Sequence, residues 1–347
     1  MQNFFKALHF ELTHQCNLCC KHCYNIKYLD SKTPDLTINE VKRVIDIARN
    51  VGCQDFGFSG GEPFCREDFV EVLEYTPGPI HILTNALLIK EEHLKKIDKM
   101  NKVVEFRVSF DGLESHKLIR NVDYQKVVEK IKMLLRHDHV VTVNTMLTPY
   151  NAYELWEMYT LLRRLKIDRW RIDFIFNSGN ALSNNLAKNN EESFRAVKAL
   201  IERYITERPA FEFDVNKFFR SVFLEGAIRT QYSSNTKVCS YQGALTVRPG
   251  GEVSFCPSLG VTYGNILKDP IQKIIANENW KKFKDIRIKD IEKCLECKLL
   301  AICGGGCRAD AYYSTGSYYK PDECTCHAME FYYKEIRPII EKKIGSK

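Results

Sequence analysis

The 347-residue sequence lacks the features that would place it in a membrane or outside the cell. No apolar run approaches the ~20 residues that a membrane-spanning helix needs, which excludes a protein anchored in a bilayer by such a helix. The N-terminus, MQNFFKALHFELT, has no basic segment followed by a continuous apolar stretch, so it shows no secretory signal. Internal repeats and low-complexity tracts are absent as well.

The sequence also has little excess of charge. It contains 51 Lys and Arg against 44 Asp and Glu, a formal net charge of +7, which does not by itself indicate a nucleic-acid partner. A composition of 44% hydrophobic and 27% charged residues is that of an ordinary folded protein and excludes disordered, fibrous and collagen-like chains. The length predicts about two domains.

Cysteine is abundant, with 14 residues, but it is absent from the long stretch between Arg66 and Val238. Four cysteines lie between Cys16 and Cys23, and eight lie between Cys239 and Cys326. Without a secretory signal, metal binding or redox chemistry is favoured over disulfides. The distribution predicts two separate metal-binding regions. The isolated Cys53 and Cys65 are expected to be structural.

The first half of the chain alternates short β-rich runs with amphipathic stretches. Strands are predicted at Leu8–Thr13, Asp55–Ser59, Ile80–Thr84, Glu105–Ser109, Val140–Met146 and Arg171–Phe176. Helices are predicted at Asn39–Asn50, Glu67–Tyr75, Glu91–Met100, Gln125–Arg136, Ala152–Leu165 and Glu191–Thr206. Six βα units in succession predict a parallel sheet curved into a full or partial barrel, with its chemistry at the C-terminal ends of the strands.

Beyond the sixth strand the pattern changes. Asn177–Asn190 is expected to be a loop, Pro209–Ser234 a bridge, and the region from Lys237 a module built around bound metal. The C-terminal Glu335–Lys347 is expected to be a basic surface helix.

The first cysteine group has the spacing C-x3-C-x2-C at Cys16, Cys20 and Cys23, directly after the first predicted strand. Three thiolates on one loop can hold three irons of a 4Fe–4S cluster, which leaves the fourth iron open to another ligand. The alternative is a zinc or structural cysteine site. Cys16 and Cys19 form a C-x2-C pair, but the adjacent Cys20 is awkwardly placed to share an ion with them.

This motif, Cys16-Asn-Leu-Cys-Cys20-Lys-His-Cys23-Tyr24, resembles that of the radical S-adenosylmethionine (radical SAM) superfamily. The resemblance implies that Cys16, Cys20 and Cys23 bind a 4Fe–4S cluster whose open iron binds SAM, and that Cys19 is not a ligand. His22 occupies the slot in which relatives carry an aromatic residue near the adenine. Alternatively, it is a solvent-facing histidine.

Further segments resemble the superfamily in the same order along the chain. Gly60-Gly61-Glu62-Pro63 is similar to its GGEP segment, which holds the methionine amino group of SAM. By the same resemblance, Thr84-Asn85, Ser109-Phe-Asp111-Gly112, Asn144 and Arg120 are candidates for contacts with SAM. Each of these polar residues is otherwise explained as a helix cap, turn former or surface residue.

The second group of cysteines resembles the SPASM extension of radical SAM enzymes, which binds two auxiliary 4Fe–4S clusters. The resemblance rests on Cys239-x11-Gly251-x4-Cys256, Tyr263-Gly264-Asn265-Ile266 and Cys294-x2-Cys297-x5-Cys303-x3-Cys307, followed by Cys324 and Cys326. It assigns Cys239, Cys256 and Cys307 to the first auxiliary cluster. It assigns Cys294, Cys297, Cys303 and either Cys324 or Cys326 to the second. An open iron in the first cluster and a pair of zinc sites stay as alternatives.

Together these resemblances imply an α/β protein with a partial (β/α)6 TIM-like barrel and a C-terminal cysteine-rich SPASM iron–sulfur domain. The expected divisions are a barrel at residues 1–208, a bridging segment at 209–236, a SPASM domain at 237–330 and a C-terminal helix at 331–347.

The implied activity is cleavage of SAM to a 5′-deoxyadenosyl radical that abstracts hydrogen from a substrate. The first expectation is a maturase that forms a thioether, a C–C crosslink or an oxidised side chain in a peptide or protein. The alternatives are a tetrapyrrole side-chain decarboxylase or dehydrogenase of haem biosynthesis and a non-catalytic iron–sulfur carrier. Because the sequence starts shortly before the first strand, a leader-binding domain is expected to be absent and a separate leader-binding protein could serve instead. A flavodoxin- or ferredoxin-type electron donor, a reducing cytoplasm, and neither nucleic acid nor membrane are expected.

Overall fold

The computed structural model describes residues 5–26, 29, 33–175, 178–184, 186, 191–216, 218–225, 231–239 and 244–344. The chain forms two compact units that interleave along the sequence. The first comprises Met1–Ser109, Gln125–Thr142 and Ser240–Lys284, and the second comprises Phe110–Tyr124, Val143–Cys239 and Asp285–Lys347. The domain boundaries expected at residues 208, 236 and 330 stay predictions.

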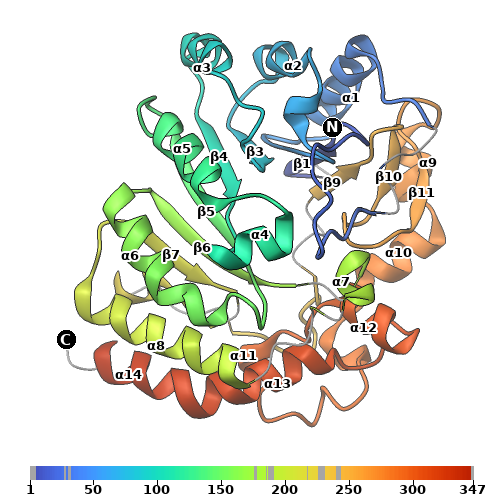
Figure 1. Ribbon diagram of the computed structural model, residues 1–347. Coiled ribbons are helices and arrows are strands. Elements are labelled where there is room, and N and C mark those ends of the chain that lie inside the picture. Colours follow the sequence, from blue (N-terminus) through green and yellow to red (C-terminus); the bar gives the residue numbers. More distant parts are fainter. Residues whose placement is uncertain are drawn as a thin grey trace. The chain divides into compact units, whose positions relative to one another are not determined.

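The first unit is built on parallel strands that alternate with helices. Its strands β1 (Ala7–Glu11), β2 (Asp55–Ser59), β3 (Ile80–Thr84) and β4 (Val104–Ser109) pair in this order, each parallel to the next. Figure 1 shows α1, α2 and α3 along one side of these strands; they span Ile38–Asn50, Phe69–Tyr75 and Glu91–Ile97. Short 3-10 turns lie at Pro63–Cys65 and Asp98–Met100, and helix α5 (Tyr124–Leu134) leads to β5 (Val140–Leu147).

The cysteine-rich segment adds three more strands to this unit, on the other edge of β1. Strand β9 (Ala244–Val247) runs parallel to β1, and β10 (Glu252–Ser254) and β11 (Thr262–Asn265) follow as antiparallel neighbours. Helices α9 (Ile271–Ile275) and α10 (Glu278–Asp285) come next. Parallel pairing with β1 makes this late segment part of the same sheet as the first strand of the chain.

The second unit contains the strand order β5-β6-β7-β8. Strand β6 (Arg169–Phe174) pairs in parallel with β7 (Glu212–Val215), and β8 (Phe219–Arg220) is antiparallel to β7. Its α-helices are α4 (Glu114–Arg120), α6 (Leu155–Leu165), α7 (Asn180–Ser183), α8 (Glu191–Glu207), α11 (Leu300–Cys303), α12 (Arg308–Thr315), α13 (Glu323–Phe331) and α14 (Arg337–Ile344). Further turns are the 3-10 segments Ala152–Glu154, Ser221–Glu225 and Ile288–Asp290 and a π-helical turn at Tyr332–Ile336.

The predicted βα units are present, with some shifted ends. Strands β2 and β3 have the predicted bounds, whereas β1 ends at Glu11 because the backbone of Thr13 already bonds the turn after β2. Strand β6 begins two residues early, and the predicted end at Phe176 lies outside the described residues. Helix α4 was not predicted.

Two predicted loop regions contain regular structure. The expected bridge Pro209–Ser234 holds β7 and β8, because the alternating Phe211, Phe213 and Val215 are buried. Of the expected loop Asn177–Asn190, the described part includes the short helix α7. The rest of that loop lies outside the described residues.

The parallel strands of the first unit have one apolar and one polar face. Phe10, Phe58, Ile82 and Phe106 are opposite one another on β1–β4, and each has no exposed surface. Alternate residues carry a polar layer on the other face, in which His9, Gly57, His81 and Glu105 are in register. Since side chains alternate along a strand, the same strands pack the core and present polar groups on the opposite side.

Glu105 collects hydrogen bonds within this polar layer. Its carboxylate accepts from His81 Nδ1 at 2.6 Å, Arg107 Nη2 at 2.7 Å and Thr142 Oγ1 at 2.5 Å. Burial favours the protonated form, but these hydrogen bonds and the charge of Arg107 outweigh it and hold the pKa of Glu105 well below its ordinary value. Glu105 is therefore ionised, and it fixes the orientation of the His81 ring.

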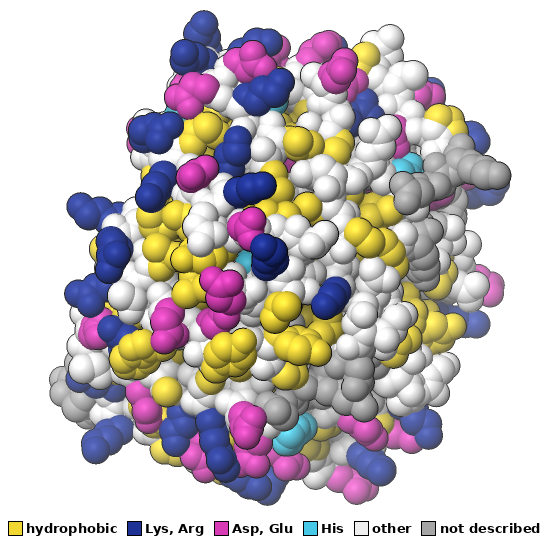
Figure 2. All heavy atoms as spheres, in the orientation of Figure 1, with side chains coloured by type: hydrophobic (Ala, Val, Ile, Leu, Met, Phe, Trp, Pro, Cys, Tyr) yellow, Lys and Arg dark blue, Asp and Glu magenta, His cyan; other side chains and the backbone are white. Residues whose placement is uncertain are grey.

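The surface carries charged side chains of both signs, in agreement with the small net charge. Figure 2 shows basic and acidic side chains interspersed over the face in view. In the part of the chain that the structure describes, no helix is long and apolar enough to cross a bilayer.

Stability should fall on acidification because of His9. Burial, together with the charges of Arg107 and Arg248, lowers the pKa of His9 to about 4. An unfolded histidine has a pKa of ~6.5, so between these values the unfolded chain binds a proton that the folded chain does not. By linkage, His9 should cost about 2 kcal/mol of stability between pH 7 and pH 5.

Anaerobic urea unfolding of the wild type and of His9→Gln at the two pH values measures this effect. We expect the wild type to lose more stability than the variant, because the variant has no imidazole to titrate. Equal losses in the two proteins would contradict the assignment.

Candidate functional site

Glu62 joins the ends of β2 and β3. Its side chain is 1% exposed and accepts hydrogen bonds from Thr84 Oγ1 at 2.7 Å, from the backbone N–H of Asn85 at 2.7 Å and from that of Phe64 at 3.3 Å. The sequence-predicted residues Glu62, Thr84 and Asn85 are thus brought together. The Glu62 carboxylate lies at the C-terminal edge of the strands, where it would favour a cationic group of a ligand.

Gly60 and Gly61 let two backbone segments approach closely. The N–H of Gly61 donates to the carbonyl of Thr13, and the N–H of Glu62 donates to that of Gln15, each at 2.8 Å. A Cβ atom on Gly61 would lie 2.0 Å from the Gln15 carbonyl oxygen, and Gly60 has a φ of +135°. These glycines are therefore required by the approach to the cysteine loop, and the contact of Gly60, Gly61 and Pro63 with SAM stays a prediction.

The loop after β1 carries Cys16, Cys20 and Cys23. Cys20 is buried, Cys16 and Cys23 are half-buried, and Cys19 is exposed. The N–H of Leu18 donates to Cys16 Sγ at 3.4 Å, and the N–H of Cys23 donates to the Cys20 carbonyl at 3.2 Å. Burial raises the pKa of the Cys16 thiol to about 12, with smaller contributions from the charges of neighbouring acidic groups. A metal would supply the positive charge that favours the thiolate there.

The donors of this loop fit an iron–sulfur cluster. Among the described residues, no three His, Cys, Asp or Glu side chains converge as the ligands of a single ion would. In a 4Fe–4S cubane each cysteine binds a different iron, so its thiols need not converge on one point. Three thiols on one short loop match that requirement.

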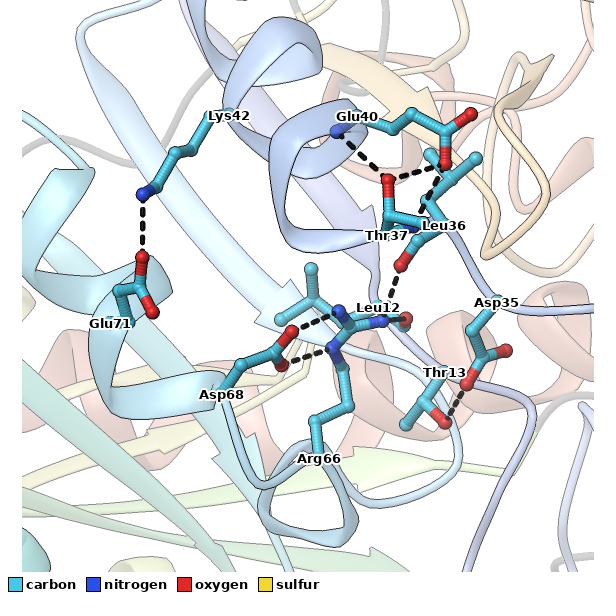
Figure 3. A network of polar contacts seen from close by, with 10 residues as sticks. All are labelled: Leu12, Thr13, Asp35, Leu36, Thr37, Glu40, Lys42, Arg66, Asp68 and Glu71. Carbon is cyan, nitrogen blue, oxygen red and sulfur yellow. Dashed lines mark hydrogen bonds and ion pairs between the residues drawn. The ribbon is translucent and has the colours of Figure 1, made fainter.

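Asp35 ties the segment that precedes Cys16 to the chain that follows the loop. Its carboxylate accepts from Thr13 Oγ1 at 2.5 Å and from the N–H of His14 at 2.9 Å, and it lies 2.7 Å from His14 Nδ1. Figure 3 shows the Asp35 side chain pointing at Thr13 from the segment that leads into α1. Sequence reasoning did not identify this residue.

Arg66 holds the same region from the turn after β2. Its Nη1 donates to the carbonyls of Leu36, at 2.9 Å, and Leu12, at 3.3 Å, while Asp68 pairs with the other side of the guanidinium at 2.8 Å (Figure 3). The end of β1 and the segment before α1 are thereby fixed to each other. A further bond, from Asn85 Nδ2 to Asn17 Oδ1 at 2.8 Å, connects the cysteine loop with the end of β3.

Two other predicted residues of the first unit have less defined surroundings. His22 is half-buried on the cysteine loop, and Ser109 is half-buried at the end of β4. The adenine-side role of His22 and the SAM contact of Ser109 stay predictions.

In the second unit, Asp111 and Arg120 form a buried ion pair. Arg120 Nε donates to Asp111 Oδ2 at 2.6 Å, and the N–H of Met146 donates to Asp111 Oδ1 at 2.7 Å. Asp111 is fully buried and Arg120 is 8% exposed. Asp111 therefore holds the turn after β4 against β5, in addition to any part that it plays toward a ligand.

Asn144 on β5 is half-buried, and its Oδ1 is a buried acceptor with no hydrogen-bond partner among the described residues. Its backbone carbonyl accepts from the N–H of Phe110 at 2.9 Å, which fixes its place on the strand. Since buried acceptors are rarely left unpaired, this atom fits the predicted contact with a ligand hydroxyl.

Glu154, which sequence reasoning missed, caps the N-terminus of helix α4 from a later segment of the chain. Its carboxylate accepts from the N–H of Leu113 at 2.6 Å and from the N–H and hydroxyl of Ser115 at 3.0 and 2.5 Å. A carboxylate from the segment after β5 thus binds the N-terminal N–H groups of α4, where negative charge is favoured.

Four cysteines of the second unit are close enough to influence one another electrostatically. They are Cys294, Cys297, Cys303 and Cys326. Burial is the main cause that raises the pKa of the Cys324 thiol to about 11, with smaller contributions from the carboxylates Asp322, Asp310 and Glu323 and from none of these four cysteines. On helix α13, residues two positions apart point about 200° apart, so only one of the two late cysteines can face the other three.

The Cys303–Cys307 turn is shaped by its glycines and by Arg308. Gly304, Gly305 and Gly306 have φ values of +74°, +84° and +78°, which only glycine adopts readily. The buried Arg308 donates to the carbonyls of Tyr318 and Lys320, both at 2.8 Å, and to that of Gly305. Its positive charge acts on the nearby cysteine thiols.

The remaining predicted ligands lie in different units. Cys307 and the half-buried Cys239 belong to the second unit, and the N–H of Cys307 donates to Asp322 Oδ2 at 2.8 Å. Cys256 is buried in the first unit, directly after β10. The grouping of Cys239, Cys256 and Cys307 around one cluster stays a prediction.

Comparison with family models gives two matches. The model of the radical SAM superfamily matches residues 10–162, and that of an iron–sulfur cluster-binding domain, SPASM, matches residues 239–298. The first match includes the cysteine loop Cys16–Cys23, and the second includes Cys239, Cys256, Cys294 and Cys297.

Similarity over nearly the whole chain extends to heme synthases and to peptide cyclases. The chain is 27% identical to an AdoMet-dependent heme synthase of Methanosarcina barkeri, over 93% of this chain and 96% of that protein. It is 26% identical to a PqqA peptide cyclase of Bradyrhizobium diazoefficiens, over 91% and 84%. Among solved structures, anSMEcpe with bound AdoMet and Cp18Cys peptide superposes with a TM-score of 0.76 at 18% identity, covering 98% of this chain and 99% of that one. This last match shows a shared fold.

A matched pair of glycine substitutions tests the close approach at Gly61. Gly61→Ala should destabilise the protein by about 3 kcal/mol or more, because the new methyl group meets backbone that cannot move aside. Gly57→Ala, on strand β2 just before this turn, is the control, since its Cβ would lie 3.5 Å from the Leu8 carbonyl oxygen, an ordinary contact.

Anaerobic unfolding midpoints and iron per chain provide the measurement. Gly61→Ala should lose both stability and iron, and Gly57→Ala should keep its iron. Similar behaviour of the two variants would refute this reading of the turn.

Proposed function

Because the chain belongs to the radical SAM superfamily and carries a SPASM domain, we propose that it is an enzyme that oxidatively modifies a peptide or protein. The modification is a thioether, a C–C crosslink or an oxidised side chain. When bound together, SAM and a reduced 4Fe–4S cluster supply a 5′-deoxyadenosyl radical, which takes a hydrogen atom from an unactivated C–H bond.

The residues of the first unit would hold this cofactor pair. Cys16, Cys20 and Cys23 are the proposed cluster ligands. The Glu62 carboxylate, which accepts buried hydrogen bonds from Thr84 and Asn85, would favour the ammonium group of SAM. His22 would lie beside the adenine.

Further residues are proposed as SAM contacts from their sequence motifs. Asn144 Oδ1, the buried acceptor without a partner among the described residues, would accept from a ribose hydroxyl. The ion pair of Asp111 and Arg120 would hold the turn after β4, with Ser109 preceding it.

Two auxiliary 4Fe–4S clusters would bring the total to three. Cys294, Cys297, Cys303 and Cys326 are the proposed ligands of the second auxiliary cluster, because these four act on one another electrostatically. Cys239, Cys256 and Cys307 would hold the first. Such clusters can accept the electron that leaves an oxidised substrate, which favours net oxidation over rearrangement.

A peptide substrate is supported by one observation above the others. The fold of anSMEcpe with a bound peptide covers nearly all of both chains, so the same scaffold accommodates a peptide. Similarity to a PqqA peptide cyclase over 91% of the chain agrees with it. A flavodoxin- or ferredoxin-type protein would supply electrons, and a separate leader-binding protein could present the substrate.

The second candidate is a tetrapyrrole enzyme of haem biosynthesis. It is favoured by the similarity to an AdoMet-dependent heme synthase, which spans 96% of that protein. Conversion of tetrapyrrole side chains would use the same SAM chemistry and the same auxiliary clusters.

A comparison of the two substrate classes in separate reactions tests the proposal. The reconstituted enzyme is incubated anaerobically with SAM, dithionite and either peptides encoded beside its gene or carboxylated porphyrinogens. We expect a peptide to lose hydrogen, seen by mass spectrometry, in proportion to the 5′-deoxyadenosine formed. Turnover of a porphyrinogen while all peptides stay unchanged would reverse the order of the two candidates.

The late cysteines provide a test of the second auxiliary cluster. Cys326→Ala should lose that cluster, about four irons per chain, because Cys326 lies within electrostatic reach of Cys294, Cys297 and Cys303. Cys324→Ala is the matched control from the same helix and should keep its iron.

Iron analysis and electron paramagnetic resonance of the reduced proteins measure both outcomes. Loss of the cluster in Cys324→Ala with retention in Cys326→Ala would show that the other cysteine is the ligand.

A further inference from the structure

Arg248 lies at the end of β9, beside the end of β1. Phe10 and Val247 are opposite each other in the parallel pair β1–β9, so Arg248 follows next to Glu11. The two side chains form an ion pair, Nη1 to Oε2 at 2.9 Å, and are 3% and 1% exposed. A buried charge pair at this depth requires further hydrogen bonds to offset its desolvation.

One side of the pair leads to the residues that follow Cys23. Glu11 Oε1 accepts from Asn25 Nδ2 at 2.8 Å and from the Tyr24 hydroxyl at 3.2 Å. Arg248 Nη1 also reaches Asn25 Oδ1, at 3.4 Å. The end of the first cysteine loop is thus attached to the ion pair by two consecutive residues.

The other side leads to the residues that follow Cys256. Arg248 Nη2 donates to the carbonyls of Pro257, at 3.1 Å, and Leu259, at 3.0 Å. A planar guanidinium offers donors in a fixed fork, so a single side chain can hold this turn and Glu11 at the same time. A lysine carries its donors on a single nitrogen, so it lacks the separate nitrogens with which Arg248 contacts Glu11 and the turn.

We propose that Arg248 is a positioning residue that fixes the turn after Cys256 to the loop that ends at Cys23, so that both thiols are set in place before any cluster forms. The inference rests on the proposed function, in which Cys23 binds the SAM cluster and Cys256 the first auxiliary cluster. The contacts themselves all lie within the first unit.

Thiol alkylation of the iron-free, full-length chain tests this positioning without relying on activity. Each cysteine's labelling rate is read by mass spectrometry after a short pulse of iodoacetamide, and circular dichroism checks folding. In Arg248→Met, labelling of both Cys23 and Cys256 should rise about tenfold, because buried hydrogen bonds that hold each segment are lost. Cys294 and Cys303, in the second unit, should label at the wild-type rate.

Two further variants separate the contact of Arg248 with Glu11 from its contacts with the Pro257 and Leu259 carbonyls. They remain informative if Arg248→Met does not fold. Arg248→Lys keeps a charge for Glu11 but loses the carbonyl fork, so Cys256 labelling should rise and Cys23 labelling should not. Glu11→Gln keeps the carbonyl contacts and weakens the bonds to Tyr24 and Asn25, so the reverse is expected.

Arg203→Met is the matched control. It removes an arginine of the second unit that bonds Glu207 at 2.8 Å and lies 3.6 Å from the Trp156 ring, and it should not change labelling of Cys23 or Cys256. A uniform rise at all cysteines in Arg248→Met, or a rise at Cys256 alone, would overturn the proposal. A wild-type chain that binds no iron would instead refute the proposed function, and the labelling pattern would still decide the positioning role.

Discussion

Parallel hydrogen bonding between β1 and β9 is the constraint on which the first unit depends. It joins a late segment of the chain to the first strand, with Phe10 opposite Val247. A slip of one residue would turn every side chain to the other face, so this register alone brings the buried Glu11 beside Arg248. From that ion pair, hydrogen bonds extend to the loop of the first cysteine group and to the turn after Cys256. The register of the sheet therefore also determines where the two cysteine segments of the first unit lie.

Much of this arrangement could be predicted from local sequence. Apolar alternation placed β2 and β3 with their observed bounds, and helical spacing identified the buried face of α1, in which Val41, Val44, Ile45 and Ala48 have no exposed surface. Cysteine spacing and the GGEP segment identified the family because such chemistry needs a fixed set of residue types at fixed intervals. Glu62, Thr84 and Asn85 were each singled out in this way, and they lie together.

What could not be predicted depends on contacts between distant residues. Helix α4 has no side-chain cap of its own, and Glu154, 39 positions after Ser115, supplies the carboxylate. Arg248 and Glu11 are 237 positions apart. The sole local sign of this pair was a carboxylate, Glu11, within a strand predicted to be largely buried. Spacing alone also left Cys324 and Cys326 equivalent, and the helical structure of α13 adds that the two point in nearly opposite directions.

The central claim, that this chain uses SAM and iron–sulfur clusters to generate a radical, has one direct test. The protein is reconstituted anaerobically with iron and sulfide, reduced with dithionite and given SAM, and 5′-deoxyadenosine and iron per chain are quantified. The account predicts nucleoside formation with about twelve irons, the content of three cubanes. A variant with Cys16, Cys20 and Cys23 all changed to Ala should retain about eight irons and form no nucleoside. Iron without nucleoside in the wild type, or zinc in place of iron, would contradict the account.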